Sequence, residues 1–320
     1  MPLPPCLVLT AGLGTRLRPL TWLRAKPALP VAGVPLVSRI LRWLAAAGTE
    51  RAVLNLHHLP ETIRAAVAEA GLPGLDVLYS YEDPILGSAG GPKKALPLLG
   101  ARRVLVVNGD TLTDVDLRAL AAEHAASRAL VTMAVVPNRE PGRYGGVLVG
   151  DDGLVSGFVR RGSLGPSWHF VGVQLLEAEA LEGVPDGRPS ESVADLYPRL
   201  IGQRPGSVRA FRCDASFRDI GTVGDYLRTS LALAAGDARL LAGARCTVAP
   251  GASIARSILW EDVTVGPGAE LRDCVATDGV SVPAGSRFEG QVLVSGQRAR
   301  AVPAGTGRMT GEGLLVVPVA

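Results

Sequence analysis

The sequence predicts an α/β fold in which a doubly wound, mostly parallel sheet is followed by a short stack of repeated strands. Two observations lead to this expectation. Over the first two-thirds of the 320 residues, short apolar runs alternate with segments of helical periodicity. After about residue 240, a 17-residue repeat replaces that alternation. We therefore expect a first domain of residues 1–236 and a second domain of residues 237–320.

Strands and helices are expected to alternate through the first domain. Val37, Ile40, Leu41 and Leu44 recur at helical spacing, and Gly48 follows where a helix C-terminus favours glycine. The expected strands cover residues 6–10, 52–56, 77–80, 104–107 and 131–136, and the expected helices cover residues 36–47, 61–70 and 115–126. Such an alternation predicts a mostly parallel sheet with helices on both faces.

Two polar or glycine-rich segments follow predicted strands directly. A glycine-rich segment begins after Thr10, and Asn108-Gly109-Asp110 follows the strand that ends at Val107. Ligands bind at the carboxyl ends of the strands in sheets of this kind. We therefore expect these two segments to contribute to one site.

The second domain is expected to be a short left-handed hexapeptide-repeat β-helix of about three coils. Three segments match at a spacing of 17 residues, and each carries two apolar residues six positions apart with a Gly/Pro corner between them. The apolar pairs are Val248 with Ile254, Val265 with Leu271, and Val282 with Phe288. A small irregular β domain is the alternative.

Composition favours a packed cytoplasmic protein. Hydrophobic residues make up 47% of the chain and charged residues 20%, which excludes disorder. The net charge of +3 is too even to indicate a nucleic-acid or membrane partner. The four cysteines have no metal-ligand spacing, and no apolar run reaches membrane-spanning length.

The glycine-rich segment has the chemistry of a phosphate-binding loop. Gly12 and Gly14 let backbone approach a ligand closely, Arg16 offers a planar fork of donors, and Lys26 offers a compact charge. No GxxxxGK[ST] string is present, and Leu17 occupies the sixth position where a dinucleotide-binding fingerprint requires glycine. Because prolines at 19, 27 and 30 oppose a long helix, we expect an extended loop.

This segment resembles the G-x-G-T-R-L-x-P-L-T loop, followed by K-P, of the sugar-phosphate nucleotidylyltransferases. That family has a Rossmann-like catalytic domain, and the likeness is strongest to mannose-1-phosphate guanylyltransferase-like members. The resemblance implies catalytic roles for Arg16 and Lys26. It implies nucleotide contacts from the same loop and from the segment that resembles E-x-x-x-L-G-T-A-G, namely from Ala11, Gly12, Gly14, Thr15, Glu82, Leu86, Gly87, Ser88, Ala89 and Gly90.

Five further segments extend the resemblance along the chain. Asp110 and Asp219 lie in segments that resemble the metal-binding strand end and the D-I-G-T segment, which implies two carboxylate ligands for Mg²⁺. Segments resembling Y-G-V-V, F-x-E-K-P and the strand lining the sugar pocket imply sugar-phosphate contacts from Gly146, Arg161, Phe170, Val171 and Gly172. Arg161 stands where the family usually has lysine, and Arg160 stands in place of the acid.

The implied reaction is transfer of a nucleoside monophosphate from an NTP to a sugar 1-phosphate with release of pyrophosphate. GTP with mannose 1-phosphate is the expected pair, and a uridylyl or thymidylyl transfer to another hexose 1-phosphate is the alternative. We also expect a homo-oligomer. A non-catalytic regulatory homologue is a further alternative, although it would be expected to lose Arg16, Lys26 or an aspartate.

Two other activities have a possible basis in the sequence, and neither is favoured. Asp114 and Asp116 resemble the DxD metal motif of glycosyltransferases, but we interpret Asp114 as the cap of the following helix and Asp116 as an acid of its first turn. Acyltransferases built on hexapeptide coils use a histidine in the coils. All four histidines of this chain precede residue 240, which excludes that activity.

Overall fold

The computed structural model describes residues 3–319 and contains two compact units. Unit 1 comprises the residues up to Gly12, 39–60 and 67–218, and unit 2 comprises residues 13–38, 61–66 and 219–320. The predicted domain boundary between residues 236 and 237 falls inside unit 2 and stays a prediction. None of the helices described is long and apolar enough to cross a membrane.

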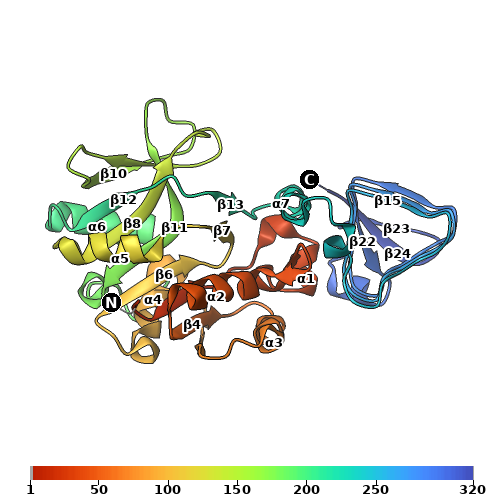
Figure 1. Cartoon of the computed structure of the whole chain (residues 1–320), viewed down its shortest axis with the longest axis horizontal. Coiled ribbons are helices and arrows are strands. Elements are labelled where there is room, and N and C mark those ends of the chain that lie inside the picture. The colour runs from red at the N-terminus through yellow and green to blue at the C-terminus, as the bar shows by residue number, and fades with distance from the viewer. Residues whose placement is uncertain (1–2, 320) are drawn as a thin grey trace. The chain divides into compact units, whose positions relative to one another are not determined.

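One half of the nine-stranded sheet of unit 1 is parallel, as the sequence predicts (Figure 1). Its order is β6-β1-β4-β5. The strands are β1 (Cys6–Leu9), β4 (Arg51–Leu56), β5 (Asp76–Tyr81) and β6 (Arg103–Asn108). β1, β4 and β6 are nearly continuous apolar runs because parallel strands are buried on both faces.

The other half of the sheet is mixed. Its strands are β8 (Val131–Pro137), β9 (Gly146–Val149), β10 (Val155–Val159), β11 (Trp168–Glu177) and β12 (Val208–Arg212). β12 is parallel to β8, whereas β11 runs antiparallel to β6, β8 and β9, and β10 runs antiparallel to β9. β9 and β10 are joined by a short turn, and a turn of that length permits only the antiparallel direction.

Helices pack on the sheet of unit 1 and complete its core. Ala89, Ala95 and Leu99 of one helix join Leu7 and Val106 of the sheet in a single buried cluster. The helical elements are α2 (Leu36–Ala47), which begins in unit 2, α4 (Gly87–Leu99), α5 (Leu117–Ala126), η3 (Ala178–Leu181), η4 (Ser192–Leu196) and α6 (Tyr197–Gln203).

The start of α5 corrects one expectation. Asp116, not Asp114, is the N-cap, because its Oδ1 accepts hydrogen bonds from the backbone N–H of Arg118 at 2.9 Å and of Ala119 at 3.0 Å. Asp114 instead accepts from the N–H and the Oγ of Ser216, both at 2.7 Å. Asp114 lies in the segment between β7 (Thr111–Thr113) and α5 and binds the segment that leads to β13 (Phe217–Asp219).

The predicted extended loop is in fact a series of short helical turns in unit 2. They are η1 (Thr15–Leu17), α1 (Leu20–Leu23) and η2 (Lys26–Ala28), followed by a hairpin of β2 (Pro30–Val31) and β3 (Val34–Pro35). Proline opposes a helix interior but is accepted at a first turn. Pro19 and Pro27 stand at such starts, which is why the prolines divide the helical structure without removing it.

The rest of unit 2 contains two longer helices and the repeated strands. α3 (Pro60–Ala70) contributes residues 61–66, and α7 (Val223–Ala234) begins with a capping box in which Thr222 and Asp225 bond each other's backbone. The Trp260 Nε1–H donates to Tyr226 Oη at 2.9 Å, and that hydroxyl donates to the Pro30 carbonyl at 2.7 Å. The hairpin, α7 and the first repeat thus share one buried contact.

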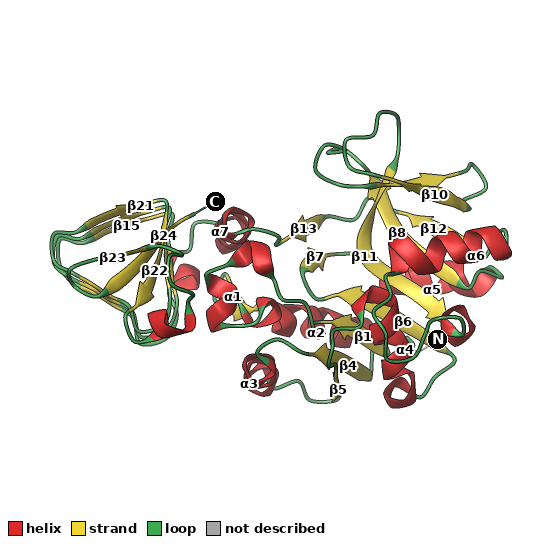
Figure 2. Cartoon of the chain, turned by 180° about the vertical axis from the view of Figure 1, so that it is seen from behind, coloured by secondary structure: helices red, strands yellow, loops and turns green. Residues whose placement is uncertain are grey.

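The repeats form coils with strands in three parallel sheets, and pairing is offset by 17 residues throughout (Figure 2). Ile254 pairs with Leu271, which pairs with Phe288. This confirms the predicted repeat. The sheets comprise β14 (Thr247–Val248), β17 (Thr264–Val265) and β20 (Ser281–Val282); β15 (Ser253–Ala255), β18 (Glu270–Arg272) and β21 (Arg287–Glu289); and β16 (Ile258–Leu259), β19 (Val275–Ala276) and β22 (Gln291–Ser295).

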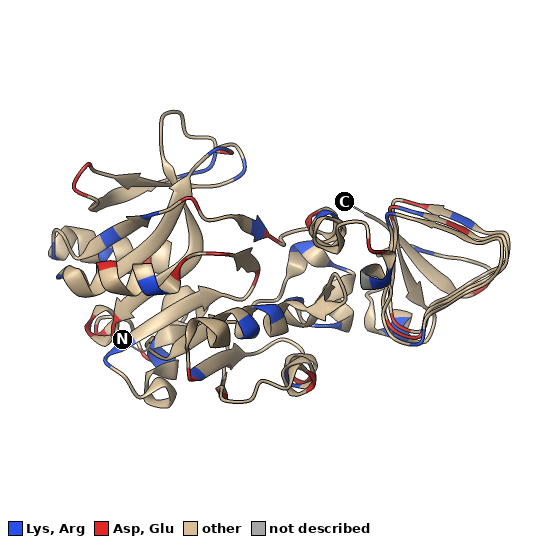
Figure 3. Cartoon of the chain, viewed as in Figure 1, with Lys and Arg blue, Asp and Glu red and all other residues tan. Residues whose placement is uncertain are grey.

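Apolar residues fill the coils and charged residues cover them. Val265, Leu271 and Val282 are buried inside, and charged residues of both signs lie on the coils, as Figure 3 shows. The chain then adds β23 (Arg308–Met309) and β24 (Leu314–Pro318), and β24 pairs antiparallel with β22. β24 therefore covers an edge of β22 that would otherwise present unpaired backbone groups.

Candidate active site

The ends of β1 and β6 lie side by side in unit 1 and carry one of the predicted metal ligands. Leu9 is in register with Asn108, and the Gly109 N–H donates to the Leu9 carbonyl at 2.9 Å. A Cβ on Gly109 would stand 2.4 Å from that oxygen, so only glycine allows this approach. The half-buried Asp110 follows at once, and its Oδ1 accepts from Thr111 Oγ1 at 3.2 Å. Ala11, which is buried, and Gly12, which is exposed, continue β1 at the same edge.

Gly172 explains how β11 passes Asn108 at this edge. Its φ of +80° lies in the left-handed region, and the β8–β11 register shifts between Phe170 and Gln174. A Cβ on Gly172 would stand 2.6 Å from Asn108 Nδ2. The bulge therefore makes room for the side chain of Asn108, two residues before Asp110. Gly172 was predicted to contact sugar, and it is buried against protein here.

Glu82 belongs to a buried chain of hydrogen bonds across three neighbouring strands. Asn55 Oδ1 accepts from the Thr10 N–H at 2.6 Å, and Asn55 Nδ2 donates to Glu82 Oε1 at 2.8 Å. Glu82 Oε2 accepts from the Leu86 N–H at 2.8 Å. These hydrogen bonds connect the ends of β1, β4 and β5 to the turn before α4. Glu82 is only 3% exposed. Its carboxylate therefore supports the predicted nucleotide-binding turn from the protein interior and is not open to solvent.

The first turn of α4 is bonded to the segment 190–192. The Ser88 N–H and Oγ both donate to Glu191 Oε2, and the N–H groups of Ala89 and Gly90 donate to the Ser190 carbonyl at 2.9 and 3.3 Å. An acidic side chain at a helix N-terminus is favourable because the N–H groups there lack helical partners. Gly87, with φ of +75°, leaves room for this carboxylate. Sequence reasoning missed Glu191, because no local pattern places it beside residue 88.

The loop of unit 2 folds back on itself around Gly14. Gly14 has φ of +59°, and a Cβ there would stand 2.8 Å from Thr21 Cγ2 and 3.2 Å from Lys26 Cβ. Thr21 Oγ1 donates to the Gly14 carbonyl at 2.9 Å. Lys26 is only 9% exposed, whereas Thr15 is exposed. The two glycines of the motif therefore differ: Gly14 is needed for the fold of the loop, and Gly12 has open space around it.

Arg16 and Asp219 lie close together in unit 2, although 203 positions separate them in the printed sequence. A Cβ on Gly221 would stand 3.0 Å from Arg16 Nη1 and 3.0 Å from Asp219 Oδ2. The predicted catalytic arginine and the predicted second carboxylate ligand therefore meet at one glycine. Arg16 is exposed and Asp219 is half-buried, so both are open to solvent.

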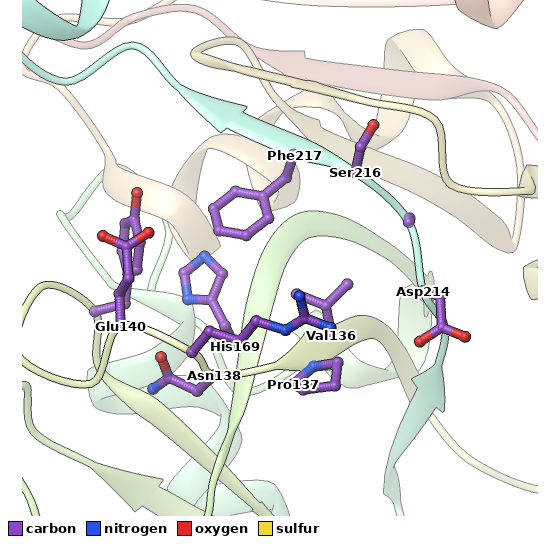
Figure 4. Close-up of a pocket in the computed structure, with 11 residues that line it drawn as sticks. Val136, Pro137, Asn138, Glu140, His169, Asp214, Ser216 and Phe217 are labelled. Carbon is purple, nitrogen blue, oxygen red and sulfur yellow. The ribbon is translucent and has the colours of Figure 1, made fainter.

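A pocket of about 330 Å³ opens in unit 1 beside the N-terminal end of β11 (Figure 4). Three rings form part of its lining: His169 lies 4.3 Å from Tyr144 and 4.6 Å from Phe217 between ring centroids. The remaining lining residues are Val136, Pro137, Asn138, Arg139, Glu140, Asp214, Ala215 and Ser216. Pockets with apolar or aromatic walls and a few polar groups are typical of small-molecule sites.

The predicted sugar-contacting residues are not among those that line this pocket, although Gly146, Phe170, Val171 and Gly172 lie within three positions of a lining residue in the sequence. Successive strand residues face opposite ways, so His169 faces the pocket while Phe170 packs against the hydrophobic cluster of unit 1. Gly146 and Val171 are buried, and Arg161 is exposed in the turn after β10. Tyr144 lay in a segment that the sequence analysis identified. Asn138, His169 and Phe217 were missed there, and strand alternation next to Phe170 was the only available signal for His169.

The ring of His169 is neutral at physiological pH. Burial lowers its pKa to about 4, and a hydrogen bond to the backbone of Gly145 opposes this only in part. Protonation would place a charge in the pocket where little water reaches the ring. His169 is therefore a neutral hydrogen-bonding group and not a cation at pH 7.

The match to known families decides where this chain belongs. The family model described as nucleotidyl transferase matches residues 6–236. The chain belongs to the nucleotidyl transferase family. This confirms the resemblance found in the loop around Gly14 and in the segments that follow it.

Curated relatives of this nucleotidyl transferase chain act on sugar phosphates, by their names. A mannose-1-phosphate guanylyltransferase of Mycobacterium tuberculosis is 32% identical over 232 residues, covering 72% of this chain and 64% of the relative. An N-acetylmuramate alpha-1-phosphate uridylyltransferase of Neisseria meningitidis is 35% identical over 221 residues, covering 68% of this chain and 93% of the relative. The match thus spans less than two-thirds of the first of these.

Solved structures support the same relationship. HddC from Yersinia pseudotuberculosis is 25% identical, with a TM-score of 0.63, covering 72% of this nucleotidyl transferase and 100% of that chain. The same protein was also solved in a complex with GMP-PN, with the same score and coverage. These matches support the α/β fold predicted from the alternation of strands and helices.

Proposed function

We propose that this chain transfers a nucleoside monophosphate from an NTP to a sugar 1-phosphate and releases pyrophosphate. An oxygen of the sugar phosphate attacks the α-phosphorus of the NTP. The bond from that phosphorus to the bridging oxygen breaks, and pyrophosphate leaves with the electron pair. Two polyanions have to meet, so the enzyme must supply positive charge and positioning. We propose that Arg16 steadies the leaving pyrophosphate and that Lys26 neutralises the attacked phosphate.

The meeting of Arg16 and Asp219 at Gly221 is the observation that carries this proposal. An exposed arginine beside a half-buried carboxylate is the arrangement expected where a phosphate and its counter-ion are bound together. Lys26 stands beside Gly14 in the same loop. Arg16 and Lys26 are both present, and so are the two aspartates proposed as metal ligands. The alternative of a non-catalytic regulatory homologue is therefore disfavoured.

We propose Asp110 and Asp219 as the carboxylate ligands of Mg²⁺. Among residues 3–319, no three His, Cys, Asp or Glu side chains could hold a metal ion by themselves. Mg²⁺ takes one or two protein carboxylates and completes its coordination with phosphate oxygens and water, so this donor set fits the ion. When bound, the ion supplies positive charge to the reacting phosphates.

The remaining predicted contacts stay proposals about the nucleotide and the sugar. We propose that Gly12, Gly14 and Thr15 bind the triphosphate through backbone N–H groups and that the turn before α4 contacts the base. GTP with mannose 1-phosphate is the proposed pair, supported by the name of the Mycobacterium relative. UTP is the second candidate, because the Neisseria relative is a uridylyltransferase by name.

We further propose that the C-terminal coils form a left-handed hexapeptide β-helix and that the protein is a cytoplasmic homo-oligomer. The offset of 17 residues between paired strands and the buried apolar ladder support the first part. Light scattering on the purified chain tests the second part, because a monomer at micromolar concentration contradicts it.

A matrix of four NTPs against several sugar 1-phosphates, with Mg²⁺ present, tests the proposed activity. Pyrophosphate release is measured for each pair, and omission of the sugar phosphate serves as the control. We expect release that depends on both substrates and is fastest with GTP and mannose 1-phosphate. Absence of release for every pair contradicts the proposed reaction.

A further inference from the structure

The chain just before Lys26 is bonded to the repeated coils of unit 2. The Arg24 guanidinium donates to both carboxylate oxygens of Asp278, at 3.1 and 2.7 Å, and to Glu261 Oε1 at 3.1 Å. Asp278 Oδ1 also accepts from the Glu261 N–H at 3.2 Å. Glu261 and Asp278 occupy equivalent positions of successive repeats, 17 residues apart. A planar fork of donors thus meets two acceptors at one corner of the coils.

The chain just after Lys26 reaches the same corner through a buried tyrosine. Tyr226 Oη donates to the Pro30 carbonyl at 2.7 Å and accepts from the Trp260 Nε1–H at 2.9 Å. The Trp260 ring also lies 5.1 Å from the Arg24 guanidinium, so both attachments share one ring. We call these coil residues the anchor corner: Trp260, Glu261 and Asp278.

Burial distinguishes the anchor corner from a surface ion pair. Trp260 is 1% exposed, Tyr226 is fully buried, and the side chain of Asp278 is 5% exposed. Exposed ion pairs contribute little, because water competes for the charges and the side chains stay mobile. A buried bidentate pair stacked on an aromatic ring keeps one geometry instead. The corner therefore fixes both ends of the segment 24–30.

Hydrogen bonds within this segment extend that geometry to Lys26. The Ala28 N–H donates to the Ala25 carbonyl at 2.8 Å, and the Leu29 N–H donates to the Lys26 carbonyl at 3.2 Å. A lysine side chain is flexible by itself, so its backbone and the packing of its stem decide where the ammonium group lies. Lys26 is only 9% exposed, which leaves its stem little freedom.

We propose that the anchor corner positions Lys26, so that turnover depends on coil residues that act through this lysine. The role of Lys26 in turnover rests on the proposed function. A charge stabilises a transition state only where it lies against the developing charge. Displacement of a positioned group by about 1 Å can lower a rate by about 10²-fold. Loss of one attachment should therefore lower kcat, although the corner itself carries no proposed substrate contact.

Two variants each break one attachment with little change in shape. Tyr226→Phe removes the hydroxyl that joins Trp260 to Pro30, and Asp278→Asn removes the charge that faces Arg24. We expect kcat for pyrophosphate release to fall about tenfold in each variant, with KM for the NTP changed by less than about twofold. Rates are measured at a temperature at which circular dichroism shows every variant to be folded.

The same substitutions in a Lys26→Met background show whether they act through this lysine. We expect the further fall in kcat to stay below about twofold there, because the charge that the corner positions is already gone. Residues that affect turnover independently of Lys26 would multiply its effect instead. A purely structural role for Tyr226 or Asp278 predicts that multiplication.

Val282→Ala is the matched control for lost stability. Val282 is buried in the core of the coils and not at the anchor corner. The variant should melt at a lower temperature, since a buried side chain is shortened, and should keep kcat within about twofold of the wild type. If Asp278→Asn does not fold, Glu261→Gln replaces it, because Glu261 also accepts from Arg24 and has a more exposed side chain.

The outcomes separate the positioning role from the proposed activity. A fall in kcat that is confined to the corner variants and nearly disappears in the Lys26→Met background supports positioning. Wild-type turnover with unchanged kcat in the corner variants, equal losses in Val282→Ala, or full multiplication with Lys26→Met overturns positioning and leaves the activity standing. Absence of pyrophosphate release by the wild type for every substrate pair overturns the activity and the positioning role with it.

Discussion

Arg24 and Asp278, 254 positions apart, are joined by two hydrogen bonds within unit 2. Arg24 Nε lies 3.1 Å from Asp278 Oδ2, and Nη2 lies 2.7 Å from Oδ1. The guanidinium also lies 5.1 Å from the centroid of the Trp260 ring, in cation–π contact. Burial by itself lowers the pKa of Arg24, and the attraction of Asp278 and Glu261 more than reverses this, so that its pKa is raised. The repeated coils thus hold the chain two residues before Lys26.

Removal of either partner of this pair should destabilise unit 2. Asp278 has a side chain only 5% exposed, and in Arg24→Met it keeps the hydrogen bond from the Glu261 N–H at 3.2 Å and the 3.5 Å contact with Arg298. Loss of one partner from a buried pair leaves a charge poorly compensated, and we expect a loss of about 2 kcal/mol in the free energy of unfolding. Urea unfolding measures it. The double variant Arg24→Met with Asp278→Asn should recover part of the loss, and strictly additive losses would show that the two side chains do not stabilise each other.

Lys26 and Asp110 should be needed for turnover and not for folding. Lys26→Met keeps most of the buried volume and removes the charge, and Asp110→Asn keeps the shape of the carboxylate. We expect kcat for pyrophosphate release to fall by about 10²–10³ in each, because a positioned charge is lost from the transition state. Lys93→Met, in α4, is the control and should behave as the wild type. Wild-type rates in both site variants, with unchanged melting temperatures, contradict the assignment.

The two glycines of the loop should respond differently to alanine. Gly14→Ala places a Cβ 2.8 Å from Thr21 Cγ2 at a φ of +59°, and we expect a loss of about 1–2 kcal/mol in stability. Gly12→Ala meets no atom within 4 Å, so its stability should be unchanged. If Gly12 admits a phosphate, the added methyl should raise KM for the NTP at least fivefold. Thermal melting together with NTP kinetics tests both variants, and an unaltered KM for Gly12→Ala removes that residue from the binding site.

Glu82→Gln should weaken the buried chain that supports the turn before α4. The wild-type carboxylate accepts from both Asn55 Nδ2 and the Leu86 N–H. A glutamine has to turn an NH₂ group toward one of these donors, which leaves buried groups unpaired, and we expect a loss of about 2 kcal/mol. Chemical denaturation measures this loss, and Glu61→Gln, on an exposed acid in the first turn of α3, is the control. Equal stability of the two variants argues against the buried chain.

The stability of the protein should decrease as the pH is lowered, and part of this decrease should depend on His169. Its pKa is about 4 in the folded state against 6.5 for a free histidine. Between these values the unfolded state binds more protons, so stability is lost as the pH falls from about 6.5 toward about 4. Melting temperatures across that range should decline more steeply for the wild type than for His169→Phe. Parallel curves for the two proteins contradict the lowered pKa of His169.

Much of the architecture follows from local pattern. The predicted helix at residues 36–47 matches α2, and the strand predicted at 52–56 matches β4 within one residue. The repeat also predicted which coil residues pair, because stacked turns of similar sequence place equivalent residues side by side. The loop from Thr15 to Ala28 was predicted wrongly as extended, since proline limits where a helix begins and does not exclude short helical turns.

The sequence by itself determined the family, the alternation of strands and helices, the coils and the identity of the charged loop residues. Each of these depends on residues that lie close together in the sequence. Only the tertiary structure decided that Arg16 meets Asp219 at Gly221, that Arg24 pairs with Asp278, and that His169 lines the pocket while Phe170 does not. These relationships depend on how distant segments pack. No local periodicity encodes such contacts, because packing is set by the whole chain at once.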